Sequence, residues 1–141
     1  IMTNIQKIHT ILYVEDQEIS TGFYTKVLRQ TPALNVPGMT EFRLTKYFTL
    51  GLMPNSSIAK ILNGKTPPPQ SGTGIPRCEL YLYVDDIEEE LTNIIQNNIE
   101  LISGLEDRSW GDRAFYFADP DGHIIAFATK TQKKDSLWKS A

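Results

Sequence analysis

The stretch Asp119-Pro120-Asp121-Gly122-His123-Ile124-Ile125-Ala126 decides the fold of this chain. Its first four residues place aspartate, proline and glycine at the first, second and fourth positions, which are the preferences of a type I turn. The apolar residues after the turn are typical of a β-strand, and so are residues 113–118 before it. The sequence therefore predicts a hairpin of two strands, at 113–118 and 123–129.

This hairpin closes a pattern that occurs twice in the chain. Residues 9–16 align without a gap with residues 79–86, at an offset of 79 − 9 = 70. Leucine, tyrosine, valine and aspartate recur at the same positions of the two segments, ending in Asp16 and Asp86. Each segment predicts a strand followed by a helix that begins after its aspartate, which is a favoured N-cap. An internal repeat of this kind indicates two structural modules of the same topology.

The two modules are predicted to contain the same order of elements. In the first copy these are a strand at 8–14, a helix at 17–29, an extended stretch with a turn at Pro37-Gly38, and strands at 41–45 and 47–53. In the second they are a strand at 79–84, a helix after Asp86, and strands at 99–102, 113–118 and 123–129. The predicted fold class is α+β, with two tandem βαβββ modules that form a half-open curved mixed sheet around one cavity and carry their helices outside.

The whole chain, residues 1–141, is expected to form a single domain of this type. Module 1 is predicted at about 5–63 and module 2 at about 77–130. The linker at 64–76 is rich in proline and glycine, which favour neither helix nor central strand. The tail, 131–141, is predicted either to dock on a partner subunit or to fray.

Composition excludes several classes of partner. The net charge of −3 gives no indication of a nucleic-acid or anionic-membrane partner. No apolar run approaches the length of a membrane span, and residues 1–4 lack the features of a signal peptide. The single cysteine, Cys78, excludes an internal disulfide and a multi-cysteine zinc site. The sequence therefore predicts a cytoplasmic protein.

The repeat, combined with Trp110-Gly111-Asp112-Arg113 and the later Asp119-Pro120-Asp121-Gly122-His123, resembles the vicinal oxygen chelate superfamily. This superfamily includes glyoxalase I, bleomycin resistance proteins and extradiol dioxygenases. The resemblance covers about residues 5–130. For the metal-dependent members it implies one ligand at the start of each module's first strand and one on each module's last strand.

Carried onto this chain, the resemblance implies a depleted set of metal ligands. The first-strand positions hold His9 and Glu79, and the last position holds Ala126. The remaining ligand falls at Thr49 or Gly51, and neither is a usual ligand of a divalent metal. Because a catalytic zinc needs about three protein ligands, no metal is expected.

If Zn, Ni, Mn or Fe does bind, His9 and Glu79 are its expected ligands, and the same two residues are the candidate catalytic groups. The only other histidine, His123, is predicted to face away from Ala126 because residues three apart on a strand point to opposite faces.

Aromatic residues complete the predicted binding cavity. If Glu79 faces the cavity, strand alternation turns Tyr81 and Tyr83 toward it as well. Trp110 is placed at the mouth, where it would stack on a flat or cationic ligand. Plain sheet packing for the tyrosines, and a loop position that covers the edge of the core for Trp110, stay open as alternatives.

Three functional hypotheses follow. The leading one is a homodimeric protein that binds a small organic molecule, in the manner of the bleomycin-resistance-like branch, with a degraded or absent metal site. The alternative is a metal-dependent lyase or dioxygenase with an atypical ligand set built on His9 and Glu79. The third is a scaffold whose cavity is vestigial.

Overall fold

The computed structural model describes residues 2–131, so the predicted docking of the tail lies, beyond Thr131, outside the described residues. The chain divides into two compact units between Gly74 and Ile75, within the stretch predicted as linker.

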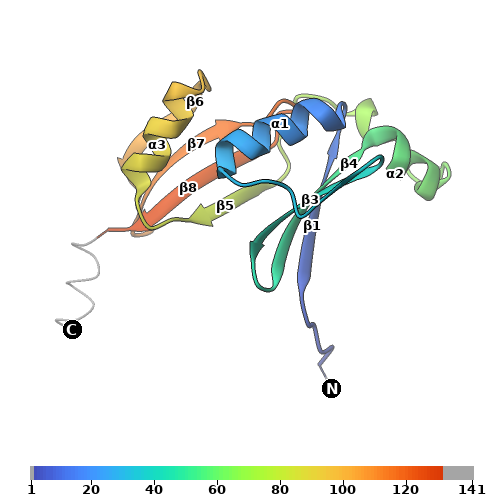
Figure 1. The fold of residues 1–141 in the computed structure, drawn as a ribbon, viewed down its shortest axis with the longest axis horizontal. Helices are drawn as coiled ribbons and strands as arrows, with labels where there is room; N and C mark the ends of the chain where they lie inside the picture. Colours follow the sequence, from blue (N-terminus) through green and yellow to red (C-terminus); the bar gives the residue numbers. More distant parts are fainter. Residues whose placement is uncertain (1, 132–141) are drawn as a thin grey trace. The chain divides into compact units, whose positions relative to one another are not determined.

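The first unit is one four-stranded sheet with a helix packed on it (Figure 1). Its elements are β1 (Ile8–Val14), α1 (Gln17–Leu28), β2 (Leu34–Val36), β3 (Met39–Thr45), β4 (Phe48–Pro54), α2 (Asn55–Leu62) and the short 3-10 helix η1 (Pro69–Ser71). The strand order is β1-β4-β3-β2, with β1 parallel to β4 and the other pairs antiparallel. Asp16 caps α1 as predicted, because its carboxylate accepts a hydrogen bond from the backbone N–H of Ile19 at 3.0 Å.

The core of the first unit lies between α1 and one face of the sheet. Residues that alternate along β1 and β4 point to this face, since side chains on a strand alternate between its two sides. The buried side chains are Leu12, Val14, Tyr24, Val27, Phe42, Leu50 and Leu52. The opposite face of this sheet is the one on which His9, Thr49 and Gly51 lie.

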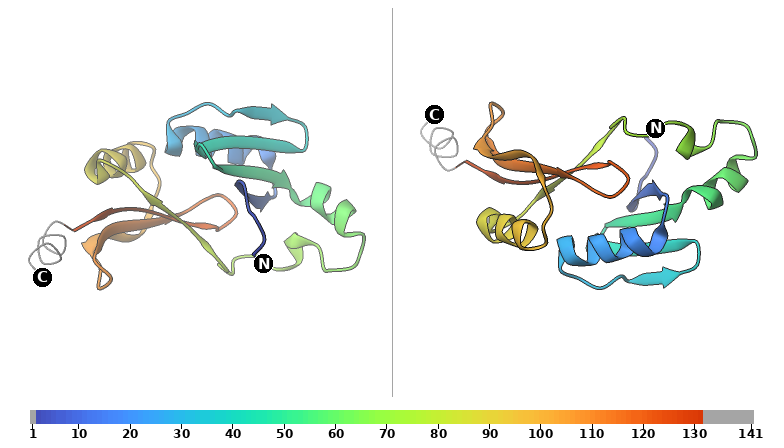
Figure 2. Two further views of the ribbon diagram at one scale, coloured as in Figure 1. Left: turned by 90° about the horizontal axis from the view of Figure 1, so that it is seen from below. Right: turned by 90° about the horizontal axis from the view of Figure 1, so that it is seen from above.

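The second unit repeats this topology. Its elements are β5 (Glu79–Tyr83), α3 (Ile87–Gln96), β6 (Leu101–Asp107), β7 (Asp112–Ala118) and β8 (Ile124–Lys130). The order β5-β8-β7-β6, with β5 parallel to β8, matches that of the first sheet. Figure 2 shows α3 against one face of its own sheet and α1 against one face of its own. The predicted α+β fold of two tandem βαβββ modules is confirmed.

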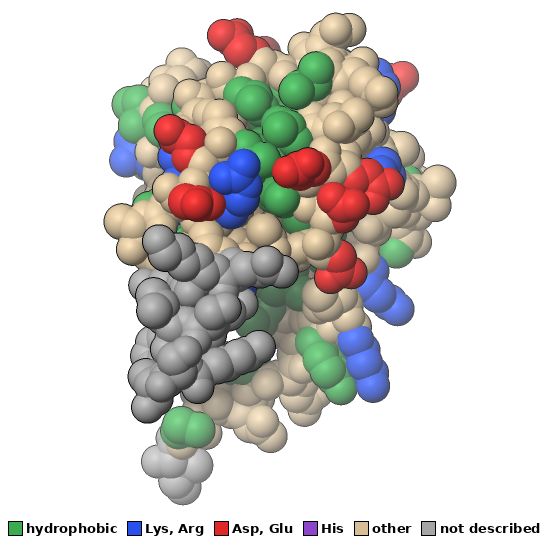
Figure 3. Space-filling model, turned by 90° about the vertical axis from the view of Figure 1, so that its left-hand side faces the viewer, with side chains coloured by type: hydrophobic (Ala, Val, Ile, Leu, Met, Phe, Trp, Pro, Cys, Tyr) green, Lys and Arg blue, Asp and Glu red, His purple; other side chains and the backbone are tan. Residues whose placement is uncertain are grey.

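The carboxylate of Asp86 caps α3 by accepting a hydrogen bond from the backbone N–H of Glu89 at 3.1 Å. Three glutamates, Glu88, Glu89 and Glu90, fill the first turn, where the positive end of the helix dipole stabilises negative charge. Figure 3 faces the end of the molecule that carries α3, and acidic side chains lie over it among hydrophobic ones. Within residues 2–131, no helix is both long enough and apolar enough to cross a membrane.

Several element boundaries differ from the prediction. The strand predicted at 99–102 is β6 at Leu101–Asp107, an edge strand whose exposed, charged end looks like a loop in the sequence. The helix α2 was not predicted; its apolar stripe rests largely on Ile58, which is buried, and on Leu62. His123 was predicted to open the last strand, but β8 begins at Ile124 and His123 belongs to the turn.

Candidate functional site

One face of the second sheet carries polar and aromatic side chains, and we call it the tyrosine face. It consists of Glu79, Tyr81, Tyr83, Asp112, Ala114, Tyr116, Ala118, Ile124, Ala126, Ala128 and Lys130. The opposite face carries the buried phenylalanines Phe115, Phe117 and Phe127, whose ring centroids lie 5.7 to 6.1 Å apart. Since α3 packs over the phenylalanines, the tyrosine face is left for other contacts.

Ala126 lies in the middle of the tyrosine face. It is fully buried, and in the sheet register it stands between Tyr81 on β5 and Tyr116 on β7. Ala114 and Ala128 form the next row and are fully buried as well. Small methyl groups thus form a fully buried floor, which larger side chains cover.

A hydrogen-bonded chain runs across one end of this face. The hydroxyls of Tyr81 and Tyr83 donate to the same oxygen of Asp112, Oδ2, at 2.8 Å and 2.6 Å. The indole Nε1 of Trp110 in turn donates to the Tyr81 hydroxyl at 2.9 Å. Asp112 is only 1% exposed, whereas Trp110 is 53% exposed. A buried carboxylate therefore fixes two phenols, and one of these holds an exposed indole.

Lys130 supplies the positive charge beside this carboxylate. Its Nζ lies 3.4 Å from Asp112 Oδ1 and 4.9 Å from the centroid of the Tyr83 ring. Oδ1 is fully buried and has no hydrogen-bond partner within residues 2–131, so its contact with Lys130 is electrostatic. Burial acts to raise the pKa of Asp112, but the hydrogen bonds from Tyr83 and Tyr81 and the positive charge of Lys130 outweigh it and lower that pKa below the ordinary value.

Two phenols of this face, Tyr81 and Tyr116, are hard to ionise. Burial, with a further contribution from the Asp112 carboxylate, raises the pKa of Tyr81 to about 12, although the hydrogen bond from Trp110 opposes the shift. Burial also raises the pKa of Tyr116, and the negative charge of Glu79 adds to the effect. The guanidinium of Arg108 lies 5.1 Å from the centre of the Tyr116 ring. At neutral pH Tyr81 and Tyr116 are therefore neutral groups.

The turn before β7 places Trp110. The backbone N–H of Gly111 donates to the carbonyl of Arg108 at 3.1 Å, and the carbonyl of Gly111 accepts from the N–H of Thr131. Gly111 has φ +94°, a left-handed conformation that is strained for residues with a side chain. The glycine that follows Trp110 thus closes the turn from which the indole projects toward Tyr81.

On the first sheet, His9, Thr49 and Gly51 share one face. His9 pairs with Thr49 in the register, and its Nδ1 lies 3.6 Å from Oε2 of Glu41. Gly51 is closely covered: a Cβ placed on it would come within 2.6 Å of Cδ1 of Ile11 and 3.3 Å of Sδ of Met39. Glu41, a carboxylate neighbour of His9, is a residue that sequence reasoning missed.

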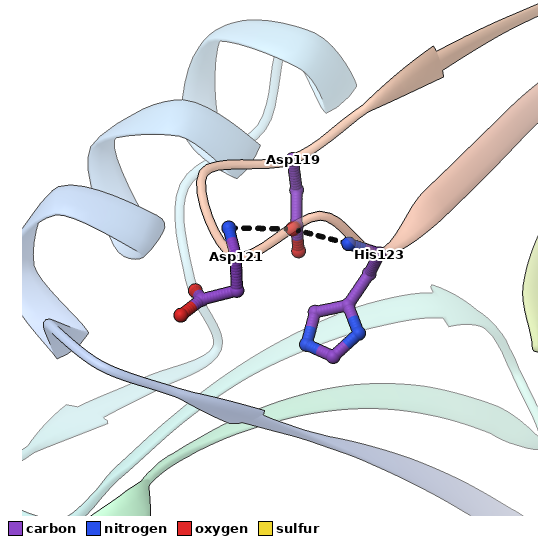
Figure 4. Close-up of side chains that lie close together, drawn as sticks. All are labelled: Asp119, Asp121 and His123. Carbon is purple, nitrogen blue, oxygen red and sulfur yellow. Dashed lines mark hydrogen bonds between the residues drawn. The ribbon is translucent and has the colours of Figure 1, made fainter. Parts of the chain in front are cut away.

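A third group of ligand-type side chains lies in the turn that opens β8. Asp119, Asp121 and His123 each offer one ligand atom, and these atoms lie within 4.8 Å of one another (Figure 4). Asp119 Oδ1 accepts hydrogen bonds from the backbone N–H groups of Asp121 and His123, both at 2.9 Å. The Asp119 carboxylate is therefore held by the turn, as is usual for an aspartate at the first turn position. This group could hold a cation, but the turn alone accounts for its geometry.

The predicted site residues thus fall into two sets. His9, Thr49 and Gly51 lie on one face of the first sheet, and Glu79, Tyr81, Tyr83 and Ala126 lie on the tyrosine face of the second, with Trp110 bonded to it. Sequence reasoning missed Asp112, Tyr116 and Lys130. The available signal was the alternation along residues 112–118, which places Asp112 and Tyr116 on the same side of their strand.

Comparison with known proteins agrees with this architecture. The model of the glyoxalase-like domain family matches residues 7–131. An uncharacterized protein of Mycobacterium bovis is 28% identical over 115 residues, which cover 79% of this chain and 75% of that protein.

Two solved structures have similar folds. One is a glyoxalase/bleomycin resistance protein/dioxygenase from Nocardioides, with a TM-score of 0.75 and 20% identity, covering 94% of this chain and 87% of that one. The other is a glyoxalase-related enzyme from Fulvimarina pelagi, with a TM-score of 0.73 and 21% identity, covering 89% and 88%. The resemblance to the vicinal oxygen chelate superfamily is thereby confirmed, and the chain belongs to the glyoxalase-like domain family.

Proposed function

We propose that this protein binds a small organic molecule on the tyrosine face of its second unit, and that it does so without a resident divalent metal. The observation that carries the proposal is the face itself. Its alanine floor is fully buried, and the side chains that a ligand can reach are the exposed rings of Tyr83 and Trp110. Sites for small organic ligands are usually lined by aromatic side chains with a few fixed polar groups.

The side chains at the family's ligand positions argue against a metal of the usual kind. Ala126 has no donor atom and is fully buried between two tyrosines. Gly51 has no side chain, and Ile11 fills the space that one would need. Thr49 is not a usual ligand of a divalent metal. Only His9 and Glu79 remain, fewer than the three protein ligands that a catalytic zinc requires.

The tyrosine face offers the ligand aromatic contacts and hydrogen bonds rather than a nucleophile. Tyr83 and Trp110 are each more than half exposed, so their rings are accessible for stacking. Glu79 is exposed at the start of β5 and provides the negative charge of this face, while Lys130 provides a positive one. These groups fit a planar organic molecule that carries polar substituents.

Thermal unfolding in the presence of a panel of planar organic molecules tests the proposal. A true ligand at 100 times its Kd should stabilise the protein by about 2.7 kcal/mol. Trp110→Ala should abolish the shift. Tyr47→Ala is the matched control, because Tyr47 is an equally exposed aromatic, 60% accessible, beside a lysine in the first unit. If no compound raises the melting temperature of the wild type, the hypothesis of a scaffold with a vestigial cavity replaces the proposal.

The absence of a metal is tested separately. Elemental analysis after purification without chelators should find less than stoichiometric Zn, Ni, Mn and Fe. Stoichiometric metal in the wild type that is lost in His9→Ala contradicts the proposed absence of a metal. It does not contradict the proposed binding of an organic molecule.

One observation favours the second candidate, a metal-dependent lyase or dioxygenase built on His9 and Glu79. Glu41 stands 3.6 Å from His9, so a carboxylate is already beside the only histidine at a family ligand position. On this reading His9→Ala, Glu41→Gln and Glu79→Ala each abolish metal binding. Binding that persists in both His9→Ala and Glu79→Ala excludes it.

The homodimer and the cytoplasmic location stay predictions. Sedimentation equilibrium of the full chain measures the first, and a mass equal to one chain at micromolar concentration contradicts it.

A further inference from the structure

Trp110 is exposed, yet its indole is not free to move. Its Nε1–H donates to the hydroxyl of Tyr81, and that hydroxyl donates onward to Asp112. An exposed tryptophan that makes no such bond samples several rotamers and must be ordered when a ligand stacks on it. Here the hydrogen bond to Tyr81 orders the indole, and that bond depends on a residue that does not itself reach the surface.

Asp112 is suited to this role by burial and by its acceptor geometry. It is 1% exposed, and its Oδ2 accepts both tyrosine hydroxyls. Because the Tyr81 hydroxyl donates its hydrogen to Oδ2, the lone pairs of the tyrosine oxygen point outward and accept the N–H of Trp110. The direction of the Tyr81 hydroxyl, and through it the position of the indole, is therefore set by the carboxylate behind it.

The second tyrosine provides an internal comparison. Tyr83 donates to the same Oδ2 at 2.6 Å and packs edge-on against Tyr81, with ring centroids 5.4 Å apart. Its hydroxyl contacts Lys130 at 3.4 Å and makes no bond to Trp110. Removing the Tyr83 hydroxyl thus perturbs Asp112 while leaving the bond that holds the indole in place.

We propose that Asp112 is a positioning residue that presets Trp110 through Tyr81, so that the tyrosine face is ordered for stacking before a ligand arrives. This inference rests on the proposed binding function, since it names the device that organises the binding surface. The Asp112 carboxylate accepts hydrogen bonds from the two phenols and lies beside Lys130, and the hydrogen-bonded link from it to the indole runs through Tyr81.

Fluorescence of Trp110 in the full chain tests the positioning. All variants carry Trp138→Phe, because Trp138 is the other tryptophan of the chain. Tyr81→Phe and Asp112→Asn should lower the emission anisotropy of Trp110 and raise its quenching by acrylamide, while Tyr83→Phe should leave both unchanged. Circular dichroism verifies that each variant is folded. Should Asp112→Asn fail to fold, the two tyrosine variants still decide the matter.

Two results overturn the inference: a folded Tyr81→Phe variant with unchanged anisotropy, or a Tyr83→Phe variant that changes as much as Tyr81→Phe. The second would mean that Asp112 supports the whole face and not the indole in particular.

Binding is measured with 1-methylnicotinamide, a planar cation that quenches indole fluorescence when it stacks. Ordering one side chain on binding costs about 0.5–1.5 kcal/mol, so loss of the preset indole should weaken binding roughly two- to tenfold in Tyr81→Phe and Asp112→Asn. Equal affinity of wild type and both variants contradicts a role in binding. If the probe fails to bind the wild type, the proposed function is wrong for planar cations. The anisotropy measurement tests the positioning of Trp110 independently of this result.

Discussion

Gly51 stands at one of the two alternative ligand positions on β4, and its environment predicts how the chain responds to any side chain there. A Cβ at this position would lie 2.6 Å from Cδ1 of Ile11, about 1 Å closer than an ordinary carbon–carbon contact. Sδ of Met39 would lie 3.3 Å away. Because Cδ1 is the far end of a side chain, Ile11 can turn aside, but only by leaving its rotamer minimum.

The size of the effect follows from two opposing terms. Overpacking costs about 1–3 kcal/mol, and the lower end applies here because the clashing atom is a terminal methyl group. Replacing glycine by alanine within a strand returns about 0.5–1 kcal/mol of backbone entropy. Gly51→Ala should therefore lower the free energy of unfolding by at most about 0.5 kcal/mol. Gly104→Ala is the control, because that glycine of β6 has no atom within 4 Å of an added Cβ, and its stability should stay equal or rise.

Urea unfolding of a double-mutant cycle measures the contact directly. Ile11→Val removes Cδ1 and, on its own, should cost about 0.5 kcal/mol, since Ile11 is only half-buried. In the Ile11→Val background Gly51→Ala should stabilise the protein by about 0.5–1 kcal/mol, which gives a coupling of about 1 kcal/mol. A coupling below about 0.5 kcal/mol refutes the reasoning, because the two positions would then be independent.

Four further predictions follow from the same structure. Gly22→Ala, at an exposed position inside α1 with no atom near an added Cβ, should raise the free energy of unfolding by about 0.5–1 kcal/mol in urea titrations. Asp86→Ala should lower it by about 1 kcal/mol, since the capping bond to Glu89 is lost. Asp112→Asn should lower it by about 1–3 kcal/mol at pH 7, because charged hydrogen bonds are lost. Because folding lowers the pKa of Asp112, its charged carboxylate stabilises the fold at pH values above the ordinary pKa of 3.8. This stabilisation is lost as the pH falls through the pKa of the folded state. The difference in the free energy of unfolding between wild type and Asp112→Asn should therefore shrink on acidification. Ultraviolet titration should show one phenol fewer ionising at about pH 12 in Tyr81→Phe.

The fold could be predicted from the sequence because the repeat supplies the same information twice. The strand that ends at Asp16 and the one that ends at Asp86 share residues, caps and the helices that follow them. Edge elements were harder to predict. β6 alternates between half-buried and exposed residues along an exposed edge, so its polar half resembles a loop, and α2 follows Pro54 without a side-chain cap.

The candidate site could be predicted only in outline. Strand alternation was enough to place Tyr81, Tyr83 and Ala126 on the same face. The carboxylate that connects them could not be found this way, because Tyr81 and Asp112 are 31 residues apart and meet only across three strands of the folded sheet. The close contact between Gly51 and Ile11 was invisible for the same reason. The alternation of residues along a strand predicts which face of the sheet each side chain lies on. Which side chains on other strands it contacts is decided by tertiary packing.

The buried floor of the tyrosine face also limits which amino-acid substitutions this chain can accept. A single substitution of Ala126 by glutamate would restore the residue type that the family's last ligand position usually holds. That side chain would have to fit between Tyr81 and Tyr116, at a position with no exposed surface, and bring a carboxylate out of water. At least one of the two tyrosines must become smaller first, which disturbs either the bond to Asp112 or the contact with Arg108. The step from alanine back to a metal ligand therefore needs several linked substitutions, and the order in which they arise decides whether each intermediate still folds.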